Sequence, residues 1–132
     1  MTVEWAIENV LARSERPGRY LGSRGQVPKA VVHNWIKDIQ AEGIASIICL
    51  LDDEQLSFYS GLDGGLLEAY LNADFQLRHV PTQDHAYPPL SDEQLEQIWD
   101  AFEELPKPVL VHCSAGICRT GAAIEYIQER YP

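Results

Sequence analysis

The apolar run ASIICLL, residues 45–51, is the feature that most restricts how this chain can fold. A short run without charges and rich in isoleucine is typical of a strand buried on both faces of a sheet. The segment VLVH at 109–112 has the same character, and FQLRHVP at 75–81 alternates as a third strand would. Strands of this kind need helices on both sides, so the sequence predicts an α/β domain with a largely parallel sheet.

Helical patterns separate these strands. Apolar residues spaced by three and four predict a helix over 29–42, and Ser91 with Gln94 forms a capping-box pattern at the start of a helix over 91–105. Other predicted elements are helices over 2–13, 52–60, 66–74 and 120–131 and a short strand around Tyr20 and Leu21. The alternation predicts a single domain with a central sheet flanked by helices.

The balance of charges excludes two classes of partner. The 132 residues include 20 acidic and 10 basic side chains, which gives a formal net charge of −10. Nucleic acids and anionic membranes select basic surfaces, so neither is expected as a partner. No apolar run approaches the roughly 20 residues that cross a bilayer, and residues 1–18 lack the apolar segment of a signal peptide. We therefore expect a cytoplasmic protein.

The cysteines point away from disulfide frameworks and zinc sites. Cys49, Cys113 and Cys118 are an odd, low number, unlike the set of a small secreted domain. Their spacing, together with that of the four histidines, matches no zinc-binding pattern. Chemistry without a metal or another cofactor is expected.

The segment VHCSAGICRTG, residues 111–121, carries the chemically distinctive residues. Ligand sites in parallel sheets form beyond the carboxyl ends of strands, and Cys113 directly follows the strand VLVH. The loop between this strand and the next helix consists of Ser114, Ala115, Gly116, Ile117 and Cys118. Such a loop turns backbone N–H groups toward one centre, and Arg119 can donate two further hydrogen bonds to a tetrahedral oxyanion. The loop is therefore expected to bind phosphate, vanadate or sulfate.

A cysteine at the floor of such a loop has a defined chemical use. The helix end and the Arg119 guanidinium that attract phosphate also stabilise a thiolate at Cys113. A thiolate aimed at phosphorus can form a cysteinyl-phosphate intermediate. Thr120 is placed to donate a hydrogen bond to the sulfur, and His112 is interpreted as a residue that orients the loop backbone.

At these residues the chain resembles the cysteine-based protein tyrosine phosphatases, whose signature is HCxxGxxR[ST]G. The fixed positions are matched by His112, Cys113, Gly116, Arg119, Thr120 and Gly121. A looser similarity to the compact dual-specificity members extends over about residues 14–131. The resemblance implies the cysteine-phosphatase fold and a protein phosphatase that hydrolyses phosphotyrosine, with or without phosphoserine and phosphothreonine.

The resemblance also implies a general acid on a separate loop. Asp84, 29 residues before Cys113 in the proline-rich segment TQDHAYPP, is the candidate. Asp92 is the rival, although acids are common in the first turn of a helix because of its dipole. His85 is expected to shape the acid loop, and Tyr87 to lie either at the pocket mouth or on the open surface.

The second cysteine of the loop, Cys118, is similar to one in the low-molecular-weight tyrosine phosphatases. That similarity implies a reversible disulfide with Cys113 that protects the nucleophile from over-oxidation. Cys49, on a neighbouring strand, is the competing partner for the same role. The third alternative is that both are inert small residues.

The loop sequence also bears on the substrate. No lysine lies between Cys113 and Arg119, whereas phosphatases of this superfamily that act on phosphoinositides usually have basic residues there. The expected partner is therefore a phosphotyrosine-containing protein or peptide. Members of the family usually continue for one or two further helices. Residues 1–132 are therefore expected to be a minimal phosphatase domain, a domain shortened at its end, or a domain whose exposed side is covered by a partner.

Two alternatives belong to other classes. One is a pseudophosphatase that binds phosphoproteins without turnover, which the presence of Cys113, Arg119 and Asp84 argues against. The other is an arsenate reductase or sulfurtransferase, which shares the spacing of cysteine and arginine. Asp84 separates these enzymes from a phosphatase, because a persulfide carrier needs no acid for a leaving group.

Overall fold

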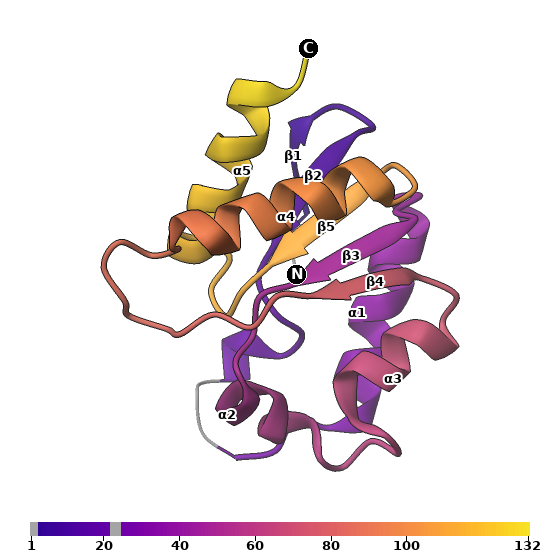
Figure 1. The fold of residues 1–132 in the computed structure, drawn as a ribbon. Coiled ribbons are helices and arrows are strands. Elements are labelled where there is room, and N and C mark those ends of the chain that lie inside the picture. Colours follow the sequence, from indigo (N-terminus) through magenta and orange to yellow (C-terminus); the bar gives the residue numbers. More distant parts are fainter. Residues whose placement is uncertain (1–2, 22–24) are drawn as a thin grey trace.

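The computed structural model describes residues 3–21 and 25–132, and a five-stranded sheet lies at its centre (Figure 1). The strands are β1 (Glu4–Ile7), β2 (Leu11–Ser14), β3 (Ser46–Cys49), β4 (Gln76–His79) and β5 (Val109–His112). They lie in the order β1-β2-β5-β3-β4, and all neighbouring pairs are parallel except β1 with β2. The predicted α/β domain with a largely parallel sheet is confirmed.

The two apolar runs form adjacent central strands. β3 pairs with β5 in a register that sets Ser46 opposite Val109 and Cys49 opposite His112. Every residue of both strands is buried, as continuous apolar runs predict for strands covered on two faces. The carboxyl ends of the four parallel strands point to one edge of the sheet, and the loop that begins at Cys113 lies at this edge.

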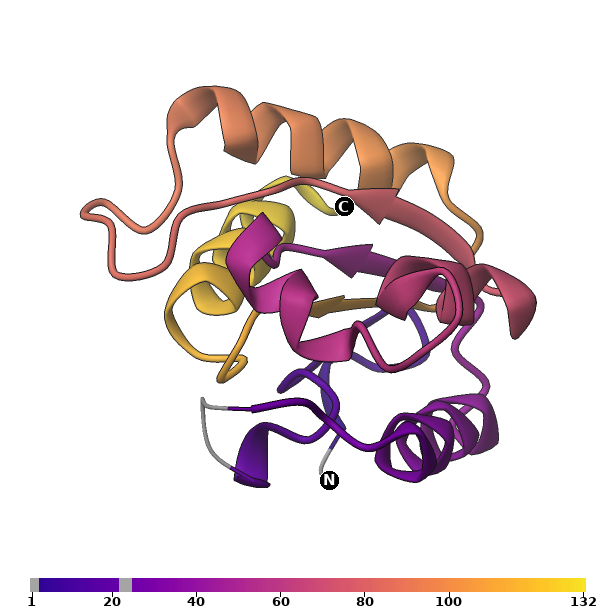
Figure 2. The ribbon, with the colours of Figure 1, turned by 90° about the horizontal axis from the view of Figure 1, so that it is seen from below.

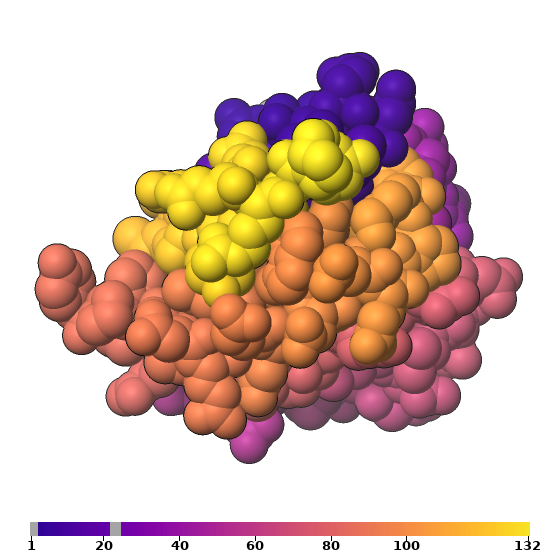
Figure 3. Space-filling view, turned by 45° about the horizontal axis from the view of Figure 1, so that its top comes forward, coloured from indigo at the N-terminus to yellow at the C-terminus, as the bar shows by residue number. Residues whose placement is uncertain are grey.

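Helices cover both faces of the sheet, which Figure 2 shows from its edge. They are α1 (Lys29–Ala41), α2 (Asp53–Leu56), α3 (Gly65–Asn72), α4 (Asp92–Glu104) and α5 (Cys118–Arg130). α1 and α3 bury residues such as Trp35 and Tyr70 in one hydrophobic cluster, whereas α4 and α5 bury Ile98, Phe102 and Ile124 in a second cluster. Figure 3 looks onto the face formed by α4 (orange) and α5 (yellow).

The helices that the sequence predicts with clear signals are present. The helix over 29–42 is α1, and the helix over 91–105 is α4, whose Ser91 and Gln94 make both hydrogen bonds of a capping box. The two short helical segments correspond to α2, followed by a 3₁₀ turn at Ser57–Tyr59, and to α3. No helix among the described residues is long and apolar enough to cross a membrane.

The predicted helix over 2–13 is wrong for its described part, residues 3–13. This segment is the antiparallel β1–β2 hairpin, with Trp5 opposite Ala12 and Ile7 opposite Leu11. Asn9 has a φ of 59°, the left-handed conformation that hairpin turns need and asparagine tolerates. The turn allows Leu11 and Ala12 to become fully buried beside β5.

Two further predictions need correction. The strand expected around Tyr20 and Leu21 is a 3₁₀ turn, Arg19–Leu21, and both apolar side chains are exposed, so no core interaction favours an extended chain there. The last helix begins at Cys118, two residues before the predicted start, so Cys118 and Arg119 lie in its first turn.

Candidate active site

The loop after β5 is held from outside by the end of β2. The Arg16 backbone N–H donates to the Ser114 carbonyl at 2.9 Å, and Arg13 Nη2 donates to the carbonyls of Gly116 at 2.8 Å and Ile117 at 3.3 Å. In a trans peptide the following N–H points away from the carbonyl. The backbone N–H groups that follow the Ser114, Gly116 and Ile117 carbonyls therefore point away from β2, toward the opposite side of the loop.

Gly116 is required where the loop passes closest to β2. Its φ is +74°, and a Cβ atom built there would lie 2.4 Å from the Ser14 carbonyl oxygen and 2.9 Å from the Glu15 nitrogen. Both contacts are with backbone that cannot move aside easily. The glycine of the signature motif therefore has a structural cause, a left-handed conformation together with close backbone contact.

Arg119 lies in the first turn of α5 and is anchored by loops after two neighbouring strands. Its side chain is 2% exposed, and Nη1 donates to the carbonyls of Leu50 at 3.2 Å and Thr82 at 3.1 Å. The Thr82 hydroxyl accepts a third bond from Nη1 at 3.1 Å and donates to the Leu50 carbonyl. These contacts occupy Nη1, while Nη2 faces Gln55 and Asp84.

Asp84 reaches the same place from the loop after β4. Its Oδ1 lies 3.5 Å from Arg119 Nη2, and its Oδ2 accepts a hydrogen bond from Gln55 Nε2 at 2.9 Å. The side chain is one-third exposed, so it contacts both solvent and buried polar groups. His85, with a φ of 60°, donates its backbone N–H to Asp84 Oδ1 at 3.0 Å.

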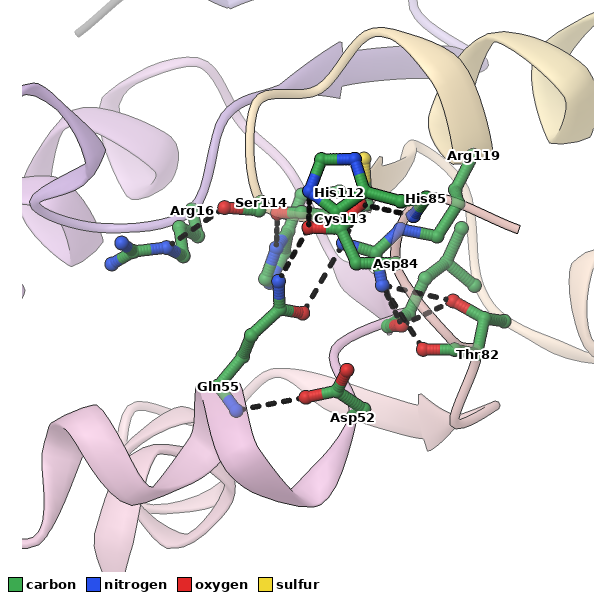
Figure 4. Close-up of polar contacts among 11 residues, drawn as sticks. Arg16, Asp52, Gln55, Thr82, Asp84, His85, His112, Cys113, Ser114 and Arg119 are labelled. Carbon is green, nitrogen blue, oxygen red and sulfur yellow. Dashed lines mark hydrogen bonds and ion pairs between the residues drawn. The ribbon is translucent and has the colours of Figure 1, made fainter. Parts of the chain in front are cut away.

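A cleft of about 890 Å³ joins these groups (Figure 4). Its floor includes all but one of the predicted loop residues: Cys113, Ser114, Ala115, Ile117, Cys118 and Arg119. Phe58, Tyr87 and Asp84 contribute to its walls, and Tyr87 is 97% exposed at the mouth. Cys113 is 3% exposed at the floor, so a ligand must enter the cleft to reach its sulfur. Asp92, the rival acid, lies in the first turn of α4 and does not line this cleft.

His112 is buried beneath the loop, and its ring is hydrogen-bonded to the loop backbone. Its Nδ1 lies 3.0 Å from the Cys113 carbonyl, and since a carbonyl only accepts, Nδ1 carries the proton. Nε2 then accepts from the Tyr70 hydroxyl at 2.9 Å. The pKa of His112 is lowered to about 4: burial is the largest cause, the hydrogen bond to the Cys113 carbonyl opposes the shift, and the charge of the nearby Arg119 adds to it. The ring is therefore neutral near pH 7, in keeping with an orienting role.

The two other cysteines have different surroundings. Cys118 is exposed and lines the cleft with Cys113. Cys49 is fully buried in the hydrophobic cluster of α1 and α3, whereas Cys113 packs in the cluster of α4 and α5. Burial raises the pKa of the Cys49 thiol to about 12, so this side chain stays protonated. Among the described residues, no group of three or more histidine, cysteine or acidic side chains could hold a metal ion.

Comparison with known families identifies the chain. Residues 22–128 match the family described as "Tc-R-P: Polymorphic toxin system, DSP-PTPase phosphatase". The chain belongs to this phosphatase family. No curated protein sequence matches significantly.

Solved structures share the fold of this phosphatase. Tk-PTP, in a mutant form, superposes with a TM-score of 0.69 at 22% identity, over 98% of this chain and 73% of that one. A putative phosphatase from Shewanella putrefaciens gives 0.62 at 16% identity, over 98% and 74%. The core catalytic domain of SIW14 from S. cerevisiae, a PP-IP phosphatase solved with citrate, gives 0.57 at 17% identity, over 96% and 64%. At these identities the likeness shows the fold, and it confirms the cysteine-phosphatase fold that the signature motif implies.

Five described residues whose side chains hydrogen-bond to the predicted site residues were not found from the sequence. They are Arg13 and Arg16 behind the loop, Gln55 and Thr82 beside Arg119, and Tyr70 beneath His112. Arg16 is 1% exposed, and its Nε donates to the Ser114 hydroxyl. The segment RSERP, residues 13–17, holds two arginines at the end of a strand, and a correct assignment of β2 would have placed them at the carboxyl edge of the sheet.

Proposed function

We propose that this phosphatase hydrolyses phosphotyrosine monoesters through a phosphorylated Cys113. The observation that carries the proposal is that Cys113 and Arg119, from the segment that joins β5 to α5, and Asp84, from the loop after β4, line one cleft. The Cys113 thiolate attacks phosphorus, the bond to the leaving oxygen breaks, and Asp84 gives that oxygen a proton. Water then attacks the phosphorus of the cysteinyl phosphate and gives a proton to Asp84. The S–P bond breaks, and the sulfur leaves as a thiolate.

The surrounding donors stabilise the charge that moves in these steps. The loop N–H groups and the Arg119 guanidinium bind the three non-bridging oxygens, which carry the negative charge of the transition state. The Thr120 hydroxyl is fully buried and has no hydrogen-bond partner among the described residues. It is the donor we assign to the sulfur of Cys113 when that sulfur becomes the leaving group.

The walls of the cleft favour an aromatic phosphate ester. Phe58, Tyr87 and Ile117 contribute apolar surface, which can contact the ring of a phosphotyrosine. Among the residues that the structure describes, Arg19 and Arg119 are the arginines in the lining, and the acids Asp52 and Glu54 also face the cleft. A substrate with several phosphates would need more cations than these, which argues against the inositol pyrophosphate chemistry named for SIW14.

Hydrolysis of aryl phosphates by wild type, Cys113→Ser and Asp84→Asn tests the reaction. Cys113→Ser should lose turnover altogether, and Asp84→Asn should lose kcat by about 10²–10⁴-fold, the usual contribution of a general acid. Vanadate should compete with substrate. Binding of phosphopeptide without turnover would instead support a pseudophosphatase, and arsenate reduction or sulfur transfer without phosphatase activity would support the other cysteine–arginine enzymes.

Substrate class is tested in the same assay. Phosphotyrosyl peptide should give a higher kcat/KM than the matched phosphoseryl peptide and than inositol polyphosphates. A preference for inositol polyphosphates would contradict the assignment of the apolar walls to a tyrosine ring, although it would leave the cysteinyl-phosphate chemistry intact.

The family description supports a second proposal about biological role. It connects this phosphatase family with polymorphic toxin systems. We propose that the chain is the phosphatase module of such a system and that its activity slows growth of a cell in which it accumulates. Wild type should slow growth and Cys113→Ser should not, at equal protein amounts. Equal growth of the two strains would contradict the proposal.

A further inference from the structure

The Gln55 side chain lies between the groups that the proposed reaction uses for proton transfer and for phosphate binding. Its Nε2 donates to Asp84 Oδ2 at 2.9 Å, and its Oε1 accepts from Arg119 Nη2 at 3.2 Å. Gln55 is only 8% exposed, although it lines the cleft. Figure 4 shows the side chain extending from α2 toward both partners. One amide therefore connects the acid loop with the first turn of α5.

The hydrogen bonds around Gln55 show that its amide is not used for helix capping. Asp52 is the N-cap of α2, and its Oδ1 accepts from the Gln55 backbone N–H at 2.8 Å. Ser91 and Gln94 occupy the same two positions at the start of α4, where the glutamine side chain turns back to accept from the Ser91 N–H at 2.9 Å. Gln55 has the same capping position, but its side chain points into the cleft.

The chemistry of the partners fixes which way the amide faces. A guanidinium only donates and a carboxylate only accepts, so Oε1 must face Arg119 and Nε2 must face Asp84. Three acceptors already occupy Arg119 Nη1, as described above. Nη2 carries two N–H donors and can bind Gln55 and an oxygen of a phosphate at the same time. Gln55 can thus stay in place when substrate binds.

We propose that Gln55 is a positioning residue that holds the Asp84 carboxyl over the leaving-group oxygen while Arg119 binds the phosphate. The inference rests on the proposed function. The Asp84 carboxyl pairs with the Arg119 guanidinium, with Oδ1 3.5 Å from Nη2. A phosphate dianion takes this place at Nη2, which removes one of the contacts that keep Asp84 in the cleft. The Gln55 amide then retains the carboxyl, and it exchanges no proton itself.

Substrates with different leaving groups distinguish a positioning role of Gln55 from a purely structural role. p-Nitrophenol is a much stronger acid than phenol, so p-nitrophenolate departs with little help from a proton donor. In Gln55→Met, whose side chain has a similar length and no hydrogen-bonding amide, kcat/KM on phenyl phosphate should fall about tenfold, because kcat/KM reports the phosphorylation of Cys113 and not the later hydrolysis of the intermediate. On p-nitrophenyl phosphate it should fall less than about threefold. Gln97→Met, an exposed position on α4, is the matched control and should alter neither rate.

A double-mutant cycle tests whether Gln55 acts through Asp84. Adding Gln55→Met to Asp84→Asn should cost nothing further on phenyl phosphate, because the acid that Gln55 positions is already absent. Equal losses on both substrates, or a further tenfold loss in the Asp84→Asn background, would overturn the inference. If Gln55→Met does not fold, Gln55→Asn, which keeps the amide but shortens its reach, is held to the same two criteria.

A wrong role for Gln55 and a wrong proposed function would give different results in these experiments. If wild type hydrolyses neither aryl phosphate, the proposed function itself is wrong. If wild type hydrolyses both and Gln55→Met shows no dependence on the leaving group, only the role of Gln55 is wrong.

Discussion

At the scale of single residues, His112 shows how burial keeps a side chain in one charge state. Its ring stacks edge-on against Trp35 and Tyr70, and both nitrogens are engaged, one as donor to Cys113 and one as acceptor from Tyr70. Protonation of His112 Nε2 would break the hydrogen bond that this nitrogen accepts from the Tyr70 hydroxyl. The neutral tautomer is therefore part of what holds the backbone at Cys113.

The same burial predicts a pH dependence of stability. The folded-state pKa of His112, about 4, lies below the ordinary value of 6.5, so the unfolded chain binds the proton more readily. This contribution is fully present above about pH 6.5 and is lost as the pH falls toward 4. It amounts to about 2 kcal/mol between pH 7 and pH 5. Urea unfolding should show this loss in wild type and not in His112→Asn, whereas parallel pH profiles of the two proteins would contradict it.

The cysteines give a second prediction for single residues. We propose that peroxide converts Cys113 to a sulfenic acid and that the Cys118 thiol attacks its sulfur, which releases water and forms a disulfide. Cys118 is exposed in the same cleft, whereas Cys49 is buried and protonated in the other hydrophobic cluster. Peptide mapping of peroxide-treated protein should find the Cys113–Cys118 bond, and thiol should restore activity in wild type but not in Cys118→Ser. A bond between Cys113 and Cys49, or recovery without any disulfide, would contradict this.

At the scale of elements, the end of β2 and the loop after β5 form one unit. The carbonyls of three loop residues accept hydrogen bonds from residues 13 and 16. These hydrogen bonds fix the orientation of the loop peptides before a ligand binds. The binding free energy therefore does not have to offset the entropy lost when a mobile loop becomes ordered.

Removal of one of these donors should therefore weaken oxyanion binding. Arg13→Met should raise the inhibition constant of vanadate roughly tenfold, because a charge-assisted hydrogen bond to two loop carbonyls is lost. The Tm should change little, since Arg13 is only partly buried. Arg78→Met, an exposed arginine on β4, is the matched control. Unchanged vanadate affinity in Arg13→Met would show that the loop keeps its shape without this arginine.

The β1–β2 hairpin is also the element where sequence reasoning failed. Trp5, Ile7, Val10 and Leu11 satisfy a helical spacing about as well as a hairpin pattern, and periodicity alone does not separate the two. The deciding features are the left-handed turn at Asn9 and the pairing of β2 with β5, about a hundred residues later. The pairing is a tertiary interaction that no local pattern contains.

At the scale of the whole molecule, the architecture was largely predictable and the polar network was not. The buried central strands and the helices that alternate with them predict the three layers, since such strands must be covered on both faces. Cys113 and Arg119 were predictable because the whole loop is contiguous in sequence. Gln55 and Arg13 were not, because their partners lie 29 and 103 residues away and only the folded chain brings them together.

Detection of the phosphorylated cysteine tests the central claim most directly. Asp84→Asn should be mixed with p-nitrophenyl phosphate and denatured rapidly, because the good leaving group allows phosphorylation while hydrolysis of the intermediate is slow. Mass spectrometry of the peptides should then find one phosphoryl group on Cys113. A protein that turns over aryl phosphates but carries the phosphoryl group elsewhere, or never carries it, would contradict the account.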